Sequence, residues 1–325
     1  MGLEELSLLT KNPFYSLIDK GVSLVPVSRR VNGNRLANQY RLSTLTPDGI
    51  SQLNQLKRKQ LEWVTRQTAS LSLLAEESPN SLSTKTPLNG HPKTLIVIPS
   101  YNEESSIVEV LEDIKKQAPQ VPILVIDDGS ADKTAQLAQE HGATVISLPY
   151  NSGYGVALQT GYIFARKNNY SIVVQMDADG QHDPACIQDL LREAKNSDVD
   201  VVIGSRFLGK NTYQTSLVRR IGMFVFGQLA SLFCKARVSD PTSGFQAIKG
   251  EAIGFVASDY YPPDYPDADF LIMLNRCGFK VREIPVKMYP SRANKSMHGG
   301  PRPVYYVLKM FLSIFVTLLR KKPRI

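Results

Sequence analysis

Apolar and polar positions alternate in a regular order between residues 93 and 203. Short runs rich in Val, Ile and Leu, typical of strands buried on both faces, lie at 94–98, 123–126, 144–147, 172–176 and 201–203. We expect helices between these runs, starting at Ser105, Asp132 and Gly155. Strand and helix in alternation predict mostly parallel strands joined by right-handed helical crossovers, and therefore an α/β sandwich.

Residues 1–74 do not follow this pattern. The stretches 22–30 and 35–43 are predicted to be two strands joined at Asn32-Gly33, a dipeptide that accepts the positive φ angles of a tight hairpin. Thr46-Pro47-Asp48 is typical of a helix start, so we expect a small α+β appendage for docking or oligomerisation. Alternatively it is a regulatory element, because YRLSTLTPDG is similar to the wing and following helix of winged-helix regulators. Residues 75–92, rich in Ser, Thr, Pro and Asn, predict a linker.

The composition is that of a globular protein, with 325 residues of which 42% are hydrophobic. Cys186, Cys234 and Cys277 lie far apart without CxxC spacing. The sequence therefore predicts neither a disulfide framework nor a zinc site, and it favours a reducing compartment. The first residues, MGLEELSLLTKN, lack a basic region followed by an apolar core, so we expect no secretory signal.

The net charge of +8 is concentrated near the C-terminus, where residues 280–325 contain eleven Lys or Arg side chains and one acid, Glu283. The run 304–319 is largely apolar but contains Lys309, and its sixteen residues fall short of the roughly twenty apolar residues that a membrane-spanning helix needs. We therefore predict a basic, amphipathic helix over 301–325 that lies in the headgroup region of a membrane or contacts a small integral membrane partner. The alternative is a helix packed on the catalytic domain. We expect no nucleic-acid partner, because the basic residues do not alternate with aromatic stacking positions.

Asp177 and Asp179 follow the apolar run 172–176 directly, within the sequence DADGQ. In an open parallel sheet, ligands bind at the edge formed by the carboxyl ends of the strands. Two carboxylates one residue apart, with Gln181 just beyond, offer the hard oxygen ligands that Mg²⁺ or Mn²⁺ takes alongside a substrate diphosphate. For this short motif taken alone, the alternative is an Asp-rich turn that closes the strand.

Polar clusters follow other predicted strands as well. PSYNEE at 99–104 follows the first strand, and DDGS at 127–130 follows the second. A carboxylate in such a turn accepts a hydrogen bond from a base, while neighbouring backbone amides face the sugar and phosphates. NSGYG at 151–155 opens the next helix with glycines that permit close approach of the backbone. Together these clusters predict one site for a nucleotide diphosphate and a metal.

Eight motifs, in order along residues 93–319, resemble those of the family 2 glycosyltransferases of GT-A fold. They are PSYNEE, VIDDGSADKT, NSGYGVALQTGY, MDADGQHDP, VIGSRF, RR, DPTSGFQ and GFKVREIPV. The branch that they resemble contains the dolichol-phosphate mannose synthases and their bacterial polyprenyl-phosphate relatives. The resemblance implies a Rossmann-like, mostly parallel sheet flanked by helices over 93–300, and the first 92 residues lie outside it.

The resemblance also implies roles for individual residues. Asp127 and Asp128 belong to the base-binding turn, and Asp177, Asp179 and Gln181 hold the metal on the diphosphate. Arg206, Arg219 and Arg220 match positions that contact phosphates, although Arg206 is alternatively a surface salt-bridge residue. The donor-binding set also includes Pro99, Tyr101, Asn102, Glu103, Gly153 and Ala178. We interpret His182 as neighbouring structure rather than a metal ligand.

The acceptor decides whether a base is needed. A hydroxyl acceptor needs a carboxylate that takes its proton, whereas a lipid phosphate is already anionic at neutral pH. Asp240 and Asp269 are the two candidates for that base, and with Arg206 they form the expected catalytic set. Alternatively Asp240 caps a turn before Pro241, and Asp269 caps a helix.

The sequence thus predicts metal-dependent, inverting transfer of a sugar from a nucleotide diphosphate sugar to a polyprenyl phosphate of dolichyl or undecaprenyl type. We expect a cytoplasmic protein that is peripherally associated with the membrane. The first alternative is transfer to a glycan or another hydroxyl acceptor in cell-surface polysaccharide synthesis. The second is an inactive scaffold that binds a nucleotide sugar, and the intact set of Asp177, Asp179, Gln181 and Arg206 speaks against it.

Overall fold

The computed structural model describes residues 92–196, 198–208, 227–228, 231–233, 238–258, 260–262, 268–289 and 302–319, together with four short strands between residues 23 and 44. The chain forms two compact units, residues 1–67 and 68–325.

The first unit contains the four short strands. β1 (Ser23–Val27) pairs antiparallel with β4 (Gln39–Thr44), and β2 (Arg30–Val31) pairs antiparallel with β3 (Asn34–Arg35). The predicted hairpin is confirmed, with β2 and β3 on either side of Asn32-Gly33. The helix expected after Thr46 and the linker at 75–91 lie outside the described residues, so the boundary at residue 74 stays a prediction.

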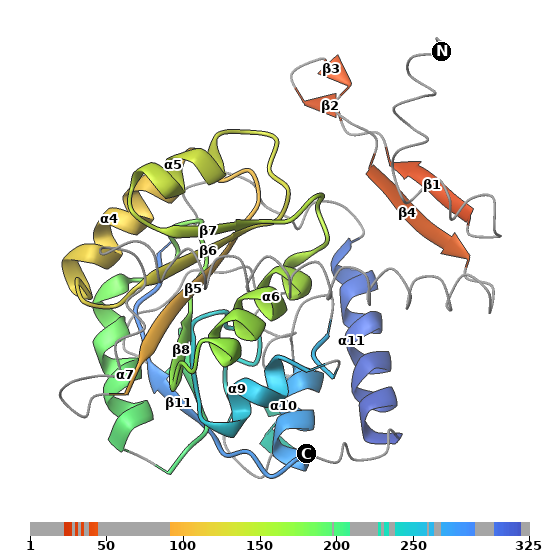
Figure 1. The fold of residues 1–325 in the computed structure, drawn as a ribbon. Coiled ribbons are helices and arrows are strands. Elements are labelled where there is room, and N and C mark those ends of the chain that lie inside the picture. The colour runs from red at the N-terminus through yellow and green to blue at the C-terminus, as the bar shows by residue number, and fades with distance from the viewer. Residues whose placement is uncertain are drawn as a thin grey trace. The chain divides into compact units, whose positions relative to one another are not determined.

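The second unit is built on a seven-stranded sheet (Figure 1). Its strands are β5 (Thr94–Ser100), β6 (Ile123–Asp127), β7 (Thr144–Ser147), β8 (Ile172–Gln175), β9 (Val201–Ser205), β10 (Gln246–Lys249) and β11 (Val281–Pro285). They are arranged in the order β11-β9-β10-β8-β5-β6-β7. Neighbouring strands are parallel except where β10 runs antiparallel to β8 and β9. Six strands therefore end at one edge of the sheet, and β10 begins there.

The five predicted strands are confirmed to within two residues at each end. β10 and β11 were not predicted, and the direction of β10 departs from the parallel alternation. The four residues of β10, QAIK, are too few to show a period of their own. Because β10 is reversed, the loop that precedes it, residues 238–245, reaches the edge where the other strands end.

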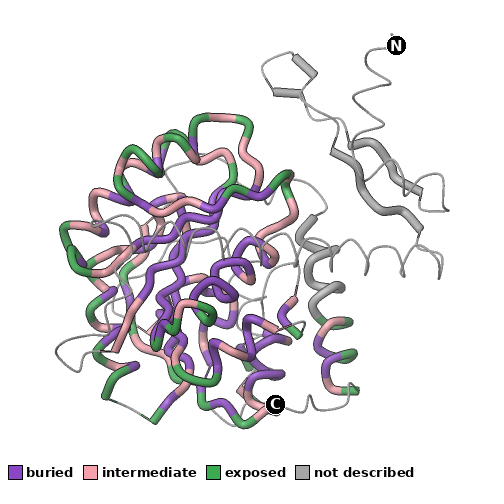
Figure 2. The backbone as a smooth tube through the Cα atoms, in the orientation of Figure 1, coloured by how far each residue is buried: buried purple, intermediate pink, exposed green. Residues whose placement is uncertain are grey.

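Helices cover both faces of the sheet (Figure 1). On one face lie α4 (Ile107–Gln117), α5 (Thr134–Glu140) and α7 (Ile187–Asn196), and on the other lie α6 (Tyr154–Lys167), α9 (Glu251–Val256) and α10 (Ala268–Arg276). Ile96 and Ile98 belong to the same hydrophobic core as the buried side chains of α4, whereas Val97 between them faces α6. The sheet is the buried centre of the unit (Figure 2). The three predicted helix starts are confirmed to within two residues.

α6 crosses β5 closely because Gly161 has no side chain at the crossing. A Cβ atom added there would come within 2.3 Å of Val97 Cγ1. α6 leads into the parallel strand β8, so it starts at the edge where the strands end. The close crossing therefore positions Gly153 and Tyr154, at the start of α6, at that edge.

α11 (Arg302–Leu319) packs on α10 along one of its faces. Ile314 and Thr317 are buried, and the Ser313 hydroxyl donates a hydrogen bond to Asp269 on α10. The predicted C-terminal helix is confirmed, and this face packs on the domain. Within the part of the chain that the structure describes, no helix has both the length and the apolar character of a membrane span.

We expect Gly161→Ala to destabilise the second unit by about 1–3 kcal/mol, because the added methyl group overpacks the contact with Val97. The matched control is Gly254→Ala in α9, where an added Cβ meets only the end of the Arg166 side chain, at 3.9 Å. The control should be neutral or stabilise by up to about 1 kcal/mol, because glycine is a poor helix former. Urea denaturation followed by circular dichroism measures both variants. Wild-type stability of Gly161→Ala would contradict the tight crossing.

Candidate active site

Several loops meet at the edge where the parallel strands end and β10 begins. Hydrogen bonds join the loop after β5 to the loop after β6, and the loop after β6 to the start of α6. Further hydrogen bonds join the start of α6 to the turn after β8, and the end of β9 to the loop before β10. The edge is therefore a connected surface built from segments that lie far apart in the sequence.

Asn102 holds the loop after β5 to the loop after β6. Its backbone N–H donates to Ser130 Oγ at 2.9 Å, and its side-chain oxygen accepts from the N–H of Ala131 at 2.8 Å. The residue has a φ of 54°, in the left-handed region that Asn adopts more readily than most residues. Asn102 thus anchors the loop, and its contact with a donor stays a prediction.

The other predicted donor contacts in this loop differ in exposure. The Glu103 N–H donates to Thr134 Oγ1 at 2.8 Å, which joins the loop to the start of α5. Pro99 is buried within β5, whereas Tyr101 is 37% exposed. Tyr101 therefore offers a ring face on which a base can stack. No contact of the structure tests these three donor assignments.

Asp128 joins the loop after β6 to the start of α6. Its carboxylate accepts hydrogen bonds from the backbone N–H groups of Ser152 at 2.6 Å and Gly153 at 2.9 Å. Gly153 has a φ of 104°, which favours glycine. Burial raises the pKa of Asp128 to about 6 against the lowering effect of these two N–H groups, and the charge of Asp127 also raises it. In this structure Asp128 holds the loop after β6 against the start of α6 through these two hydrogen bonds.

Asp127, the other predicted member of the base-binding turn, ends β6 and is almost fully buried. It accepts a hydrogen bond from the N–H of Ser130 at 3.1 Å. The predicted turn therefore exists at the functional edge. Its contact with a base stays a prediction.

The turn after β8 presents the acidic pair. Asp177 and Asp179 are partly exposed, whereas Ala178 between them is buried. The Gln181 N–H donates to Asp179 Oδ1 at 3.0 Å, which closes the turn. Tyr154, for which the sequence indicated no role, donates its hydroxyl to Asp177 Oδ1 at 2.8 Å.

The donor set of this turn fits a divalent metal ion. The carboxylates of Asp177 and Asp179 and the amide oxygen of Gln181 are hard oxygen donors of the kind that Mg²⁺ and Mn²⁺ prefer. Such ions usually take their remaining ligands from water and substrate phosphates. Among the residues described, no group of three His, Cys, Asp or Glu side chains forms a metal site by itself.

His182 contacts both the backbone and the carboxylate of Asp177. Its Nδ1 accepts from the Asp177 N–H at 3.2 Å, and its Nε2 lies 3.6 Å from Asp177 Oδ2. The ring stacks on Phe245, with ring centroids 4.9 Å apart. Burial lowers the pKa of His182 to about 4, so the imidazole is neutral at pH 7. These contacts agree with the interpretation of His182 as neighbouring structure.

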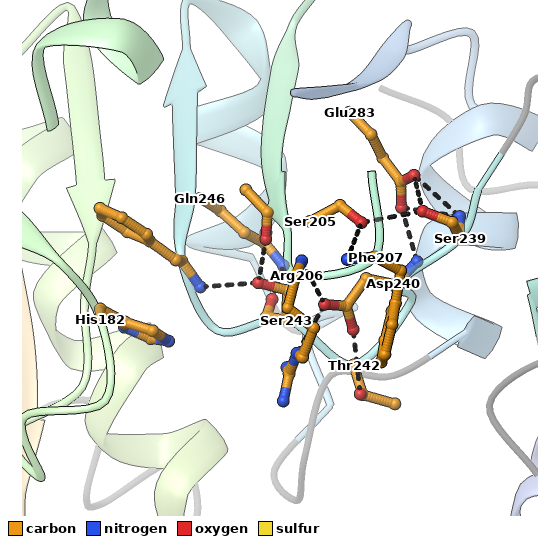
Figure 3. A network of polar contacts seen from close by, with 12 residues as sticks. His182, Ser205, Arg206, Phe207, Ser239, Asp240, Thr242, Ser243, Gln246 and Glu283 are labelled. Carbon is orange, nitrogen blue, oxygen red and sulfur yellow. Dashed lines mark hydrogen bonds and ion pairs between the residues drawn. The ribbon is translucent and has the colours of Figure 1, made fainter. Parts of the chain in front are cut away.

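Arg206, directly after β9, and Asp240, in the loop before β10, form a buried ion pair (Figure 3). Arg206 Nε and Asp240 Oδ2 are 2.6 Å apart, and the exposed fractions of the two side chains are 6% and 0%. Burial raises the pKa of Asp177, and the hydrogen bond from Tyr154 and the positive charge of Arg206 oppose this rise; that charge also adds to the lowering of the His182 pKa by burial, so the pair lies close to the acidic turn. The structure thus brings Arg206, Asp240 and the predicted metal ligands together.

Glu283 on β11 holds the turn that carries Asp240, and it was not among the predicted site residues (Figure 3). Its carboxylate accepts from the N–H of Ser239 at 2.8 Å, from the Ser239 hydroxyl at 2.6 Å and from the N–H of Asp240 at 2.8 Å. Burial raises the pKa of Glu283 against the effect of these donors. In the sequence, two features could have pointed to Glu283: it is the single acid of the basic stretch 280–325, and it lies within the motif GFKVREIPV.

Two other predictions concern Asp269 and the pair Arg219 and Arg220. Asp269 lies in the first turn of α10 and accepts from Ser313, so the structure places it at the contact between α10 and α11. Arg219 and Arg220 lie outside the described residues. A role of Asp269 as a base and the phosphate contacts of the two arginines stay predictions.

Comparisons with known sequences agree with this geometry. Residues 95–253 match the family described as Glycosyl transferase family 2. The polyprenol monophosphomannose synthase of Mycolicibacterium smegmatis is 32% identical over 219 residues, covering 64% of this chain and 82% of the relative. The dolichyl-phosphate hexose transferase of Haloferax volcanii is 30% identical over 201 residues, covering 62% of this chain and 84% of the relative.

A solved structure shows the same fold. The glucosyl-3-phosphoglycerate synthase of Mycobacterium tuberculosis, in complex with phosphoglyceric acid, aligns with a TM-score of 0.53 and 20% identity, over 70% of this chain and 80% of that chain. A complex of that enzyme with Mn²⁺, UDP and glucosyl-3-phosphoglycerate aligns with a TM-score of 0.50 and 22% identity, over 70% of this chain and 79% of that chain. The predicted GT-A fold is confirmed.

The raised pKa of Asp128 predicts a pH-dependent stability. Because its folded pKa of about 6 lies above the usual 3.8, the folded state binds this proton more tightly than the unfolded state does. This contribution to the free energy of unfolding is full below about pH 4 and is lost as the pH rises through 6, by at most roughly 3 kcal/mol. Asp128→Asn removes the titration, so the stability of the wild type relative to this variant should fall between pH 4 and pH 7.

Chemical denaturation at both pH values measures this difference. Asp198→Asn is the matched control, because a hydrogen bond from Lys280 lowers the pKa of Asp198. The contribution of Asp198 to stability is lost only as the pH falls below about 4, so the wild type should change little relative to that variant between pH 4 and pH 7. A difference between wild type and Asp128→Asn that does not change with pH would contradict the assignment.

Proposed function

The chain belongs to glycosyl transferase family 2 and is a glycosyltransferase, and on this premise we propose that it transfers a sugar from a nucleotide diphosphate sugar to a polyprenyl phosphate with inversion. The single observation that carries the proposal is that the Asp177–Asp179 turn and Arg206 lie close together at one edge of the sheet. Metal-binding oxygens and a cationic side chain together form a site for phosphate groups. Relatives named as polyprenol monophosphomannose synthase and dolichyl-phosphate hexose transferase support the acceptor class.

We assign donor binding to the turn after β8 and the loops beside it. Asp177, Asp179 and Gln181 would hold Mg²⁺ or Mn²⁺, and the fold neighbour in complex with Mn²⁺ and UDP supports a divalent ion. When bound, the ion would stabilise the negative charge that develops on the leaving diphosphate. Asp127 and Tyr101 would contact the base. The donor's base and sugar are to be identified by experiment.

The state of Asp240 favours an acceptor that needs no base. Its carboxylate is fully buried and paired with Arg206 at 2.6 Å. Its Oδ2 atom already accepts from the side chain and the backbone N–H of Arg206, so the carboxylate is engaged within the protein rather than presented to an acceptor hydroxyl. We therefore propose that Asp240 fixes the plane of the Arg206 guanidinium, which binds phosphate. A lipid phosphate is already anionic and fits this arrangement, whereas a hydroxyl acceptor would need Asp269 or another base.

We propose that α11 attaches the enzyme to the membrane surface. Opposite the face that packs on α10, Phe311, Leu312, Phe315, Val316 and Leu319 are exposed, and we call this set the apolar face of α11. Arg320, Lys321, Lys322 and Arg324 follow it in the sequence. An apolar helix face followed by a basic segment binds anionic membranes in two ways, because the apolar side chains are buried among the lipids and the positive charges attract the anionic headgroups.

Transfer is tested with radiolabelled nucleotide sugars, Mg²⁺ or Mn²⁺ and a short-chain polyprenyl phosphate, followed by extraction into organic solvent. We expect label in the organic phase with one donor, and none after addition of EDTA. Asp179→Asn should remove transfer because a metal ligand is lost, whereas Asp183→Asn, whose carboxylate accepts from Tyr289 and the Ala185 N–H, should retain it. Label that stays in water although the donor binds would favour a hydroxyl acceptor or an inactive scaffold.

Membrane attachment is tested by flotation with vesicles of phosphatidylcholine and phosphatidylglycerol. Phe315 and Leu319 are 59% and 70% exposed, and burying such a side chain contributes roughly 1.5–3 kcal/mol. We expect Phe315→Ser combined with Leu319→Ser to lower the partition coefficient at least about tenfold. The control Leu232→Ser removes an exposed leucine that lies outside α11 and should not change it. Unchanged partition of the double variant would exclude the apolar face of α11 as the attachment site.

A further inference from the structure

Asp177 is backed by a chain of hydrogen bonds that reaches into the core between the sheet and α6. The hydroxyl of Tyr154 donates to Asp177 Oδ1 at 2.8 Å, and Gln175 Nε2 donates to the Tyr154 hydroxyl at 3.0 Å. Gln175 Oε1 in turn accepts from the hydroxyl of Tyr162. Gln175 and Tyr162 are buried, so the chain of hydrogen bonds is anchored in the interior of the domain.

The direction of these hydrogen bonds is determined by the amide of Gln175. Its oxygen accepts from Tyr162, so its NH₂ group faces the Tyr154 oxygen. The proton of the Tyr154 hydroxyl is then directed at Asp177.

Gly244 closes the same arrangement from the other side. A Cβ atom at this position would lie 2.8 Å from the Tyr154 hydroxyl and 2.9 Å from Asp177 Oδ2. The backbone of the loop before β10 therefore lies directly against the contact between the tyrosine and the carboxylate. Gln175 on one side and Gly244 on the other leave the Asp177 carboxylate little freedom to rotate.

We propose that Tyr154 is a positioning residue for the metal site, which holds the Asp177 carboxylate in the orientation that a divalent ion needs. This inference rests on the proposed function, because it takes Asp177 as a ligand of that ion. Outer-sphere hydrogen bonds orient metal-binding carboxylates, and their loss typically lowers metal affinity about 10- to 100-fold. The tyrosine acts through Asp177 and does not itself touch the substrate.

Tyr154→Phe tests the inference, because it removes the hydroxyl and keeps the ring. The probe is Mn²⁺ alone, titrated into the full chain, with free Mn²⁺ measured by electron paramagnetic resonance. We expect Tyr154→Phe to weaken Mn²⁺ binding about 10- to 100-fold. Tyr289→Phe is the matched control, because it deletes another tyrosine hydrogen bond, at 3.0 Å to Asp183, and should leave the affinity unchanged.

Two further variants make the outcomes distinguishable. Gly244→Ala pushes on the Tyr154 hydroxyl and the Asp177 carboxylate without changing either residue, so it should also weaken Mn²⁺ binding and replaces Tyr154→Phe if that variant fails to fold. Asp179→Asn tests the metal site itself. Wild-type affinity of Tyr154→Phe together with loss of binding in Asp179→Asn would overturn the inference and leave the proposed metal site standing. Wild-type behaviour of Asp179→Asn would overturn both, and equal weakening by Tyr289→Phe would overturn the specific role of Tyr154.

Discussion

The buried contact between Arg206 and Asp240 is the interaction on which the arrangement of the site depends. It joins the end of β9 to the loop before β10, at a point where Asp240 is fully buried and the side chain of Arg206 is 6% exposed. Removing one partner of a buried ion pair costs roughly 3–5 kcal/mol, because the remaining charge is left uncompensated. Each segment is therefore stable in its position only while the other is present. Glu283 extends this dependence to β11, because its carboxylate accepts hydrogen bonds from the consecutive backbone N–H groups of Ser239 and Asp240.

The acidic side chains at this edge of the sheet differ in how their charge is compensated. Asp128 accepts from two backbone N–H groups, Asp240 is paired with Arg206, and Glu283 binds a backbone turn. Asp128 and Asp240 are buried and Glu283 is half-buried, and their oxygens are engaged within the protein. Asp177 and Asp179 are partly exposed, unlike Asp128 and Asp240. Because a fully buried carboxylate needs internal donors and a partly exposed one does not, Asp128 and Asp240 are committed to the fold, whereas Asp177 and Asp179 remain accessible to a ligand.

The parallel part of the fold was predictable because its strands are runs of β-branched and apolar residues and its helices start at recognisable loops. β10 was not predictable, because four residues carry no period and their direction is a property of the whole sheet. The sequence indicated Asp240 and Arg206 separately but not their pairing, because the pairing depends on the reversed direction of β10. Glu283 contributed to the sequence analysis only as a charge in a basic stretch, since its role depends on a turn 44 residues away at Ser239. The acidic turn was found because its two carboxylates and Gln181 lie within five residues of one another.

The connection between α10 and β11 relates the apolar face of α11 to the site. α10 leads into β11 through residues 277–280, and β11 ends at the functional edge, so the first turn of α10 with Asp269 lies toward that same edge. The nine residues of α10 span about 14 Å and the five of β11 about 17 Å, so the helix start reaches nearly the level at which the strand ends. Ser313 of α11 contacts this turn through Asp269. A membrane bound to the apolar face of α11 would therefore lie beside the end of the sheet that carries Arg206, and an acceptor phosphate held at that membrane surface would be near the site without leaving the headgroup region.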